Sequence, residues 1–257
     1  MKLAVVGNPI AHSKSPLIFR FLFDATDMEF SYEKLLLNSA NAIPALFKLG
    51  YSGINITSPF KQSILPFLDT ISAEASQIGS VNTVVLKNGQ LNGFNTDFLG
   101  VQNALFQNNI ELKNKKCLIL GAGGAARAAI FALKSQNAFV KICNRTSEKA
   151  QVLANEFGVG FCEQSELAKV LSETEILIDT LPMGIQLIAP SHLHENLVVL
   201  DASYPKSVYS EKNVGKLIGG EHWLLQQALP AFELFTGIDL NNIDYKQKEL
   251  LNLLNKS

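Results

Sequence analysis

Cysteine is scarce in this chain of 257 residues, which has three: Cys117, Cys143 and Cys162. Their spacing matches neither a disulfide framework nor a C-x-x-C pair. This excludes a disulfide-stapled extracellular domain and indicates a reducing compartment. We expect all three to pack in the interior. For Cys162, which begins a polar stretch, a reactive thiol is the alternative.

An excess of charge of one sign is also lacking. Lysine and arginine number 22 and aspartate and glutamate 23, which gives a formal net charge of −1. Without a basic stripe a nucleic-acid partner is not favoured, although a small anion needs only a local site. His192 and His194 lie in a polar stretch without a nearby third ligand, so no metal site is expected.

Long apolar runs are absent as well. No run reaches the ~18 residues that a membrane-spanning helix needs. The N-terminal stretch MKLAVVGNPI is interrupted too early for a signal peptide. We therefore expect a cytoplasmic protein with no membrane partner.

The chain does contain an alternation of short apolar strands and helical segments. Hydrophobic residues make up 47% of it, enough for one large domain or two of ordinary size. The alternation predicts an α/β fold with a parallel sheet, and Asn88-Gly89 predicts a hairpin. Strands are expected at 3–6, 30–37, 51–56, 81–86, 90–94, 117–120, 139–143, 160–162, 176–179 and 198–202, and helices at 17–25, 40–49, 71–77, 98–106, 147–157, 165–171, 223–235 and 245–254.

A glycine-rich turn follows the apolar run at 117–120. Gly121, Gly123 and Ala126 form a G-x-G-x-x-A pattern with Gly124 as an extra glycine, and an alanine-rich helical segment comes next. Glycines let the backbone approach a ligand, and the start of a helix attracts a phosphate through its N–H groups and dipole. The pattern predicts a dinucleotide site; a tight strand–helix turn without a ligand is the alternative.

The end of the next strand distinguishes between dinucleotides. NAD-binding sheets usually place Asp or Glu about 20 residues after the fingerprint to bind the ribose 2′-hydroxyl. This chain instead has Asn144, Arg145 and Thr146, followed by Lys149. A guanidinium suits a 2′-phosphate through forked hydrogen bonds and charge. We therefore expect NADP as the cofactor; a solvated arginine beside a helix cap is the alternative.

Two ionisable residues follow predicted strands in the first part of the chain. Lys61 comes after Asn55 and Thr57, and Asp97 comes after Asn95. A hydride delivered to a ketone builds negative charge on oxygen, which an ammonium stabilises and protonates while a carboxylate orients it. Lys61 and Asp97 are therefore candidate catalytic residues. The alternatives are an exposed lysine and a helix N-cap.

The chain resembles the shikimate dehydrogenase family along nearly its whole length. The segments that carry the likeness are GNPIAHSKSPLIF at 7–19, GINITSPFK at 53–61, GSVNTVV at 79–85, GFNTD at 93–97, GAGGAARA at 121–128, NRT at 144–146 and LLQQALPAFE at 224–233. The resemblance implies reduction of 3-dehydroshikimate to shikimate with NADPH, in chorismate and aromatic amino-acid biosynthesis. It also implies a substrate domain at 1–99, joined by C-terminal helices at 222–257, and a Rossmann-type NADP-binding domain at 100–221.

The resemblance further implies roles for individual residues. Ser13 and Ser15 would hold the substrate carboxylate at a helix start, where Ser15 suits the N-cap. Lys61 would be the acid–base group, paired to Asp97. The remaining substrate contacts would be Asn55, Thr57, Asn82, Asp97, Tyr204 and Gln227. The NADP contacts would be Gly121, Ala122, Gly123, Gly124, Ala125, Asn144, Arg145, Thr146, Lys149, Ala202 (through its backbone) and Gly220.

Some positions depart from the family pattern. Asp179 and Leu181 replace residues that usually lie beside the nicotinamide ribose, and Trp223 precedes Gln227 where methionine is more typical. For Trp223 we favour a packing role over a place near the nicotinamide. Alternatives for the function are a related enzyme that also oxidises quinate or uses NAD, and a non-catalytic dinucleotide sensor. A monomer or homodimer is expected.

Overall fold

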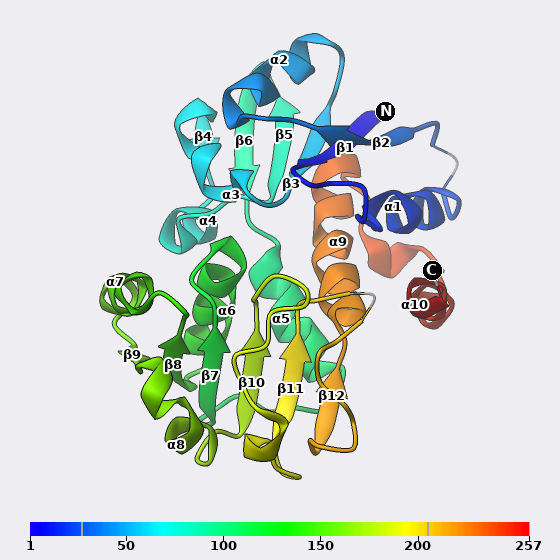
Figure 1. The fold of residues 1–257 in the computed structure, drawn as a ribbon. Coiled ribbons are helices and arrows are strands. Elements are labelled where there is room, and N and C mark those ends of the chain that lie inside the picture. The colour runs from blue at the N-terminus through cyan, green and yellow to red at the C-terminus, as the bar shows by residue number, and fades with distance from the viewer. Residues whose placement is uncertain (27, 205, 257) are drawn as a thin grey trace. The chain divides into compact units, whose positions relative to one another are not determined.

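The computed structural model describes residues 1–26, 28–204 and 206–256, and the chain forms two compact units (Figure 1). The first unit comprises Met1–Asp97 and Leu225–Ser257, and the second comprises Phe98–Leu224. The divisions fall inside two helices, α5 (Asp97–Phe106) and α9 (Gly220–Thr236). Among the described residues, none of the helices combines the length and hydropathy needed to cross a membrane.

The sheet of the first unit has the strand order β2-β1-β3-β5-β6-β4. Its strands are β1 (Lys2–Gly7), β2 (Ser31–Leu36), β3 (Gly53–Ile56), β4 (Thr70–Ile71), β5 (Thr83–Lys87) and β6 (Gln90–Phe94). β1 pairs in parallel with β2 and β3, whereas β5 pairs antiparallel with β3 and β6. The hairpin predicted from Asn88-Gly89 is confirmed: their φ angles of 55° and 76° are those that a type I′ turn requires.

Several helices belong to the first unit, and aromatic side chains join two of them, α1 (Ser15–Phe23) and the later turns of α9. The unit also contains α2 (Ile43–Lys48), α3 (Phe60–Ser63), α4 (Ala73–Ile78) and α10 (Gln247–Lys256). Phe23 of α1 meets Phe232 of α9 edge to face, with ring centroids 5.0 Å apart. Phe235 occupies the space that a Cβ on Gly53 would need. These contacts explain why the C-terminal part of the chain belongs to the first unit.

The sheet of the second unit is entirely parallel, with the order β12-β11-β10-β7-β8-β9. Its strands are β7 (Lys116–Leu120), β8 (Phe139–Cys143), β9 (Gly160–Phe161), β10 (Ile176–Asp179), β11 (Val198–Asp201) and β12 (Lys216–Ile218). Numbered within the unit, this is the order 3-2-1-4-5-6 of the Rossmann fold, read from the other edge. The topological switch point lies between β7 and β10, and the glycine-rich turn begins there, at the carboxyl end of β7.

Helices cover both faces of the second sheet, and its parallel strands agree with the predicted α/β fold. Alternate strand residues point to opposite faces. Cys117 and Ile119 of β7 pack with α5, α6 (Gly124–Ser135) and α7 (Ser147–Phe157). Leu118 and Leu120 pack with α8 (Leu167–Leu171) and with the loops after β10 and β11. Trp223 is buried in the first of these clusters, which confirms its packing role.

The structure corrects the sequence-based prediction at several local points. The edge strand β12 was not predicted, because three residues carry too short an apolar pattern. Ile71 lies in β4, and the helix expected from that residue begins only at Ala73, where Ser72 caps it. Ser15 is not the N-cap of α1: Lys14 holds that position, without a side-chain cap, and the helix ends at Phe23.

Candidate functional site

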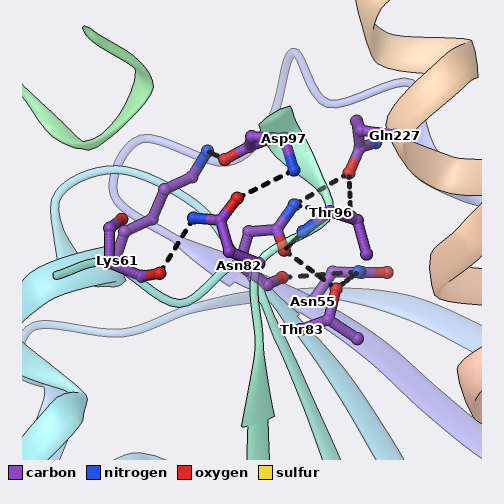
Figure 2. Close-up of polar contacts among 9 residues, drawn as sticks. Asn55, Lys61, Asn82, Thr83, Thr96, Asp97 and Gln227 are labelled. Atoms are coloured by element: carbon purple, nitrogen blue, oxygen red, sulfur yellow. Dashed lines mark hydrogen bonds and ion pairs between the residues drawn. The ribbon is translucent and has the colours of Figure 1, made fainter. Parts of the chain in front are cut away.

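An ion pair between Lys61 and Asp97 lies at one side of the polar cluster of the first unit, which comprises Asn55, Lys61, Asn82, Thr83, Asn95, Thr96, Asp97 and Gln227 (Figure 2). Nζ of Lys61 lies 2.6 Å from Oδ2 of Asp97, and the two side chains are 17% and 7% exposed. An exposed ion pair of long side chains is usually mobile, but burial and a short contact hold this one in a single geometry. The cluster therefore presents an oriented ammonium group.

Backbone contacts fix both partners of the ion pair. Lys61 follows β3 on the short helix α3, and its carbonyl accepts a hydrogen bond from Val81 N at 2.8 Å. Asp97 begins α5, and its N–H donates to Oδ1 of Asn95 at 3.0 Å. Asn95 in turn donates from Nδ2 to the carbonyl of Ser80 at 2.8 Å. Lys61 directly, and Asp97 through Asn95, are thus hydrogen-bonded to the same segment, residues 80–81.

Amide and hydroxyl side chains fill the rest of the cluster. Asn82 donates from Nδ2 to Oγ1 of Thr96 at 2.8 Å and to Oε1 of Gln227 at 3.1 Å. Its Oδ1 accepts from the N–H of Thr96 at 2.8 Å. Asn55 donates to Oγ1 of Thr83 at 3.1 Å and accepts from the hydroxyl of Tyr32 at 2.7 Å. Amide and hydroxyl groups can both donate and accept hydrogen bonds, so these side chains are suited to recognise a ligand rich in hydroxyl groups.

The two serines lie at the start of α1 in the same unit. Both are buried, and Oγ of Ser13 donates to Oγ of Ser15 at 3.2 Å. Ser15 is the first residue of the nine-residue helix, so its hydroxyl stands at the positive end of the helix dipole. Thr57 follows β3, and its Cγ2 occupies the space that a Cβ on Gly7 would need. The loop after β1 and the turn after β3 therefore contact each other.

The glycine-rich turn of the second unit is shaped for a close backbone approach. Gly121 has a φ of 109°, and a Cβ there would collide with Oγ1 of Thr180. Its N–H donates to the carbonyl of Cys143 at 2.9 Å. Gly123 is the N-cap of α6, and a Cβ there would meet nothing within 4 Å. The open space at Gly123 and the free N–H groups at the start of α6 fit a phosphate.

The segment after β8 lies beside this turn, because Cys143 pairs in register with Leu120. Nδ2 of Asn144 donates to the carbonyl of Thr146 at 3.0 Å, which shapes the entry into α7. Arg145 and Lys149 are exposed, and neither side chain has a hydrogen-bond or ion-pair partner among the described residues. Two unpaired cations at this place fit a 2′-phosphate.

The remaining predicted residues of the second unit follow β11 and begin α9. A Cβ on Gly220 would lie 2.7 Å from the carbonyl oxygen of Ala202. These two residues are therefore in direct backbone contact. Tyr204 lies in the loop after β11 and is half-buried. It belongs to the second unit, whereas Gln227 belongs to the first. Within the part of the chain that the structure describes, no group of His, Cys, Asp and Glu is arranged to hold a metal ion.

The divergent residue Asp179 ends β10 and is buried. Its Oδ2 accepts from the hydroxyl of Tyr209 at 2.6 Å, and its Oδ1 accepts from the N–H of Leu181 at 2.9 Å. Burial raises the pKa of Asp179 from 3.8 to about 6, although both hydrogen bonds act in the opposite direction. Burial likewise raises the pKa of Tyr209. The pair joins the loop after β10 to the loop after β11.

This pKa predicts how stability depends on pH. The folded protein keeps the Asp179 proton up to a higher pH than the unfolded chain, so the carboxylate destabilises the fold above about pH 6 and not below pH 3.8. The difference corresponds to roughly 3 kcal/mol. Asp179→Asn should therefore raise the free energy of unfolding by about 2–3 kcal/mol at pH 8 and by only about 0.5 kcal/mol at pH 4.

Urea unfolding of both proteins at the two pH values measures this effect. Asp24→Asn is the matched control, because the same substitution at an exposed carboxylate should change stability by less than about 0.5 kcal/mol. A gain from Asp179→Asn that is the same at pH 4 and pH 8 would contradict the assignment.

Sequence reasoning missed several members of the polar cluster. Asn95 and Thr96 lie in the GFNTD segment, so the motif indicated them, and the contact of Asn95 with Asp97 is local. The contact of Thr96 with Asn82 depends on the pairing of β6 with β5. Thr83 likewise lies in the GSVNTVV segment, whereas Tyr32, which contacts the cluster through Asn55, lies in none of the motif segments. Tyr32 lies on β2 and Asn55 on β3, so their contact spans β1, the strand between them, and could not be predicted without the strand order.

Comparisons with known proteins agree with both units. A family model described as "Shikimate dehydrogenase substrate binding domain" matches residues 5–84, and one described as "Shikimate / quinate 5-dehydrogenase" matches residues 104–219. The chain is 35% identical over 260 residues to the shikimate dehydrogenase (NADP(+)) of Carboxydothermus hydrogenoformans, with 91% of each protein covered.

Solved structures give the same result. The chain is similar to the crystal structure of shikimate dehydrogenase from Aquifex aeolicus, with a TM-score of 0.90, 32% identity, and coverage of 98% of this chain and 97% of that one. It is also similar to the shikimate 5-dehydrogenase of Thermus thermophilus solved in complex with NADP(H) and shikimate, with a TM-score of 0.87, 32% identity and 99% of each chain covered.

Proposed function

The chain belongs to the shikimate dehydrogenase family, and we propose that it is an NADP-dependent oxidoreductase that interconverts 3-dehydroshikimate and shikimate. The reaction is a hydride transfer that belongs to chorismate and aromatic amino-acid biosynthesis. The observation that carries the proposal is the buried 2.6 Å ion pair of Lys61 with Asp97, set among amide and hydroxyl side chains. A reaction that turns a ketone into an alcohol on a polyhydroxylated ring needs both features.

In the proposed mechanism, Lys61 acts on the carbonyl oxygen. NADPH, when bound by the second unit, would supply the hydride that the carbonyl carbon receives. As negative charge builds on the oxygen, the Lys61 ammonium stabilises it and donates one proton, which completes the hydroxyl group. Asp97 keeps the ammonium oriented through the 2.6 Å contact. In the reverse direction Lys61 accepts the proton of the hydroxyl group.

We assign the substrate contacts to the first unit and to one residue of the second. Ser13 and Ser15 would bind the carboxylate, and their position at the start of α1 supports this. The ring hydroxyls would be bound by Asn55, Thr57, Asn82, Asp97, Gln227 and Tyr204. The substrate domain comprises residues 1–99 together with 222–257.

We assign the dinucleotide to residues 100–221. The pyrophosphate would be bound at Gly121, Ala122, Gly123, Gly124 and Ala125, and the open space at Gly123 supports this. Asn144, Arg145, Thr146 and Lys149 would bind the 2′-phosphate. The backbone of Ala202 and Gly220 would contact the nicotinamide half. We expect the enzyme to act in the cytoplasm as a monomer or homodimer.

Initial rates test the proposal and its alternatives together. Shikimate and quinate are each assayed against NADP and NAD, by the absorbance of the reduced cofactor. We expect the shikimate–NADP pair to have by far the highest kcat/KM. A second candidate, an enzyme that also oxidises quinate, is suggested by the name of the family model that matches residues 104–219; comparable rates with quinate would favour it. Saturable NADP binding without turnover of either acid would favour a dinucleotide sensor and contradict the proposal.

A further inference from the structure

A cavity of about 590 Å³ opens in the second unit at the amino ends of its strands. It is lined by the first residues of β7 and β8, by the end of α6, by the turn after α7 and by the end of α8. Figure 1 shows α8 at this end of the strands. The glycine-rich turn follows the opposite, carboxyl end of β7, so the cavity shares no residue with the proposed dinucleotide site. Its volume is that of a small-molecule site.

The inner wall of the cavity is apolar. Val140, Val159 and Val170 contribute to it from β8, from the turn after α7 and from α8. Phe139 stands at the start of β8 with 64% of its surface exposed. β9 pairs only with residues 141–142 of β8, so it leaves Phe139 uncovered. An exposed ring beside an apolar hollow favours a ligand with a flat apolar body.

The lining is also positively charged. It contains three lysines, Lys116, Lys134 and Lys141, and one acid, Glu173. Lys116 is paired with Glu173 at 3.2 Å, and Lys134 donates to the carbonyl of Phe157. Lys141 is exposed and has no side-chain partner among the residues that the structure describes. The cavity therefore carries an unneutralised cation beside its aromatic wall.

The one thiol of the lining does not offset this charge. Burial raises the pKa of Cys117 to about 12, so the sulfur is neutral at physiological pH. A neutral buried thiol is also unreactive, which excludes a covalent site. From the apolar wall, the exposed ring and the surplus of lysine, we propose that this cavity binds a small aromatic carboxylate or sulfonate, its ring against Phe139 and Val170 and its acid group on Lys141.

The probe for this site is 1-anilinonaphthalene-8-sulfonate, an aromatic anion that fluoresces in apolar surroundings. It is titrated into the protein saturated with NADP, so that the dinucleotide site is occupied. We expect saturable binding to one site. The uncharged analogue N-phenyl-1-naphthylamine has the same rings and should bind more weakly. Binding that disappears when NADP is added would place the probe at the dinucleotide site and overturn the proposal.

Two variants at exposed positions locate the site. Lys141→Gln should raise the Kd of the probe about five-fold, the effect of one partly exposed charge pair. Phe139→Glu should abolish saturable binding, because it removes the ring and adds a repelling charge. Lys169→Gln is the matched control, since Lys169 lies on α8 outside the lining and should leave the Kd unchanged.

Two further results would overturn the proposal. The first is equal probe affinity in wild type, Lys141→Gln and Phe139→Glu, with melting temperatures showing that all are folded. The second is a concentration-dependent dimer in light scattering that Phe139→Glu dissociates, because the cavity would then be covered by a second copy of the chain.

Discussion

Replacement of Lys61 by alanine is expected to lower kcat by about 10²–10⁴-fold, the usual contribution of a positioned acid–base group. The KM for shikimate should remain near the wild-type value, because the ammonium acts chiefly on charge that develops in the transition state. Asp97 holds this ammonium at 2.6 Å in a site where both side chains are largely buried. Steady-state kinetics with shikimate and NADP measure both constants.

Three further variants separate chemistry from structure. Lys61→Gln can still donate a hydrogen bond to Asp97 but has no acidic proton, so it should be as slow as Lys61→Ala. Asp97→Asn leaves the ammonium in place without its orienting charge, so its kcat should fall between the wild type and Lys61→Ala. Lys87→Ala, at an exposed position of the β5–β6 hairpin, should behave as the wild type. If Lys61→Ala retains most of kcat, Lys61 is not the acid–base group.

Local signals in the sequence predicted part of this site and not the rest. The φ angles of Asn88 and Gly89 follow from the preferences of these two residues alone, so the hairpin turn could be predicted from the sequence. Asn95 is different: it supports Asp97 by accepting a backbone hydrogen bond at 3.0 Å and donating another to Ser80. The hydrogen bond to Ser80 depends on how β6 lies against β5, and residue spacing does not encode this directly.

The second unit shows the same division between local and long-range information. The near-continuous apolar run of β7 predicted a buried parallel strand, and Gly121 predicted the turn that follows it. The strand β12 escaped prediction because its three residues acquire their role only by pairing with β11. The need for glycine at position 220 is apparent only from the fold, where a Cβ would lie 2.7 Å from the carbonyl oxygen of Ala202.

Replacement of Arg145 by alanine is expected to weaken NADPH binding by about 10- to 100-fold, the loss of charge-assisted hydrogen bonds to a phosphate. NADH binding should change little, since it has no 2′-phosphate. The side chain is exposed and has no partner among the described residues, so its removal breaks no contact within the fold. Fluorescence titration with the two cofactors measures both dissociation constants.

Matched variants show whether Arg145 binds the 2′-phosphate through its forked hydrogen bonds or through its positive charge alone. Arg145→Lys keeps the charge but loses the forked donors, so its NADPH affinity should lie between the wild type and Arg145→Ala. Lys169→Ala, an exposed cation on α8 of the same unit, should leave both affinities unchanged. Equal losses for NADPH and NADH in Arg145→Ala would mean that Arg145 does not read the 2′-phosphate. Selectivity for NADP would then have to come from the other residues assigned to the 2′-phosphate, Asn144, Thr146 and the exposed cation Lys149.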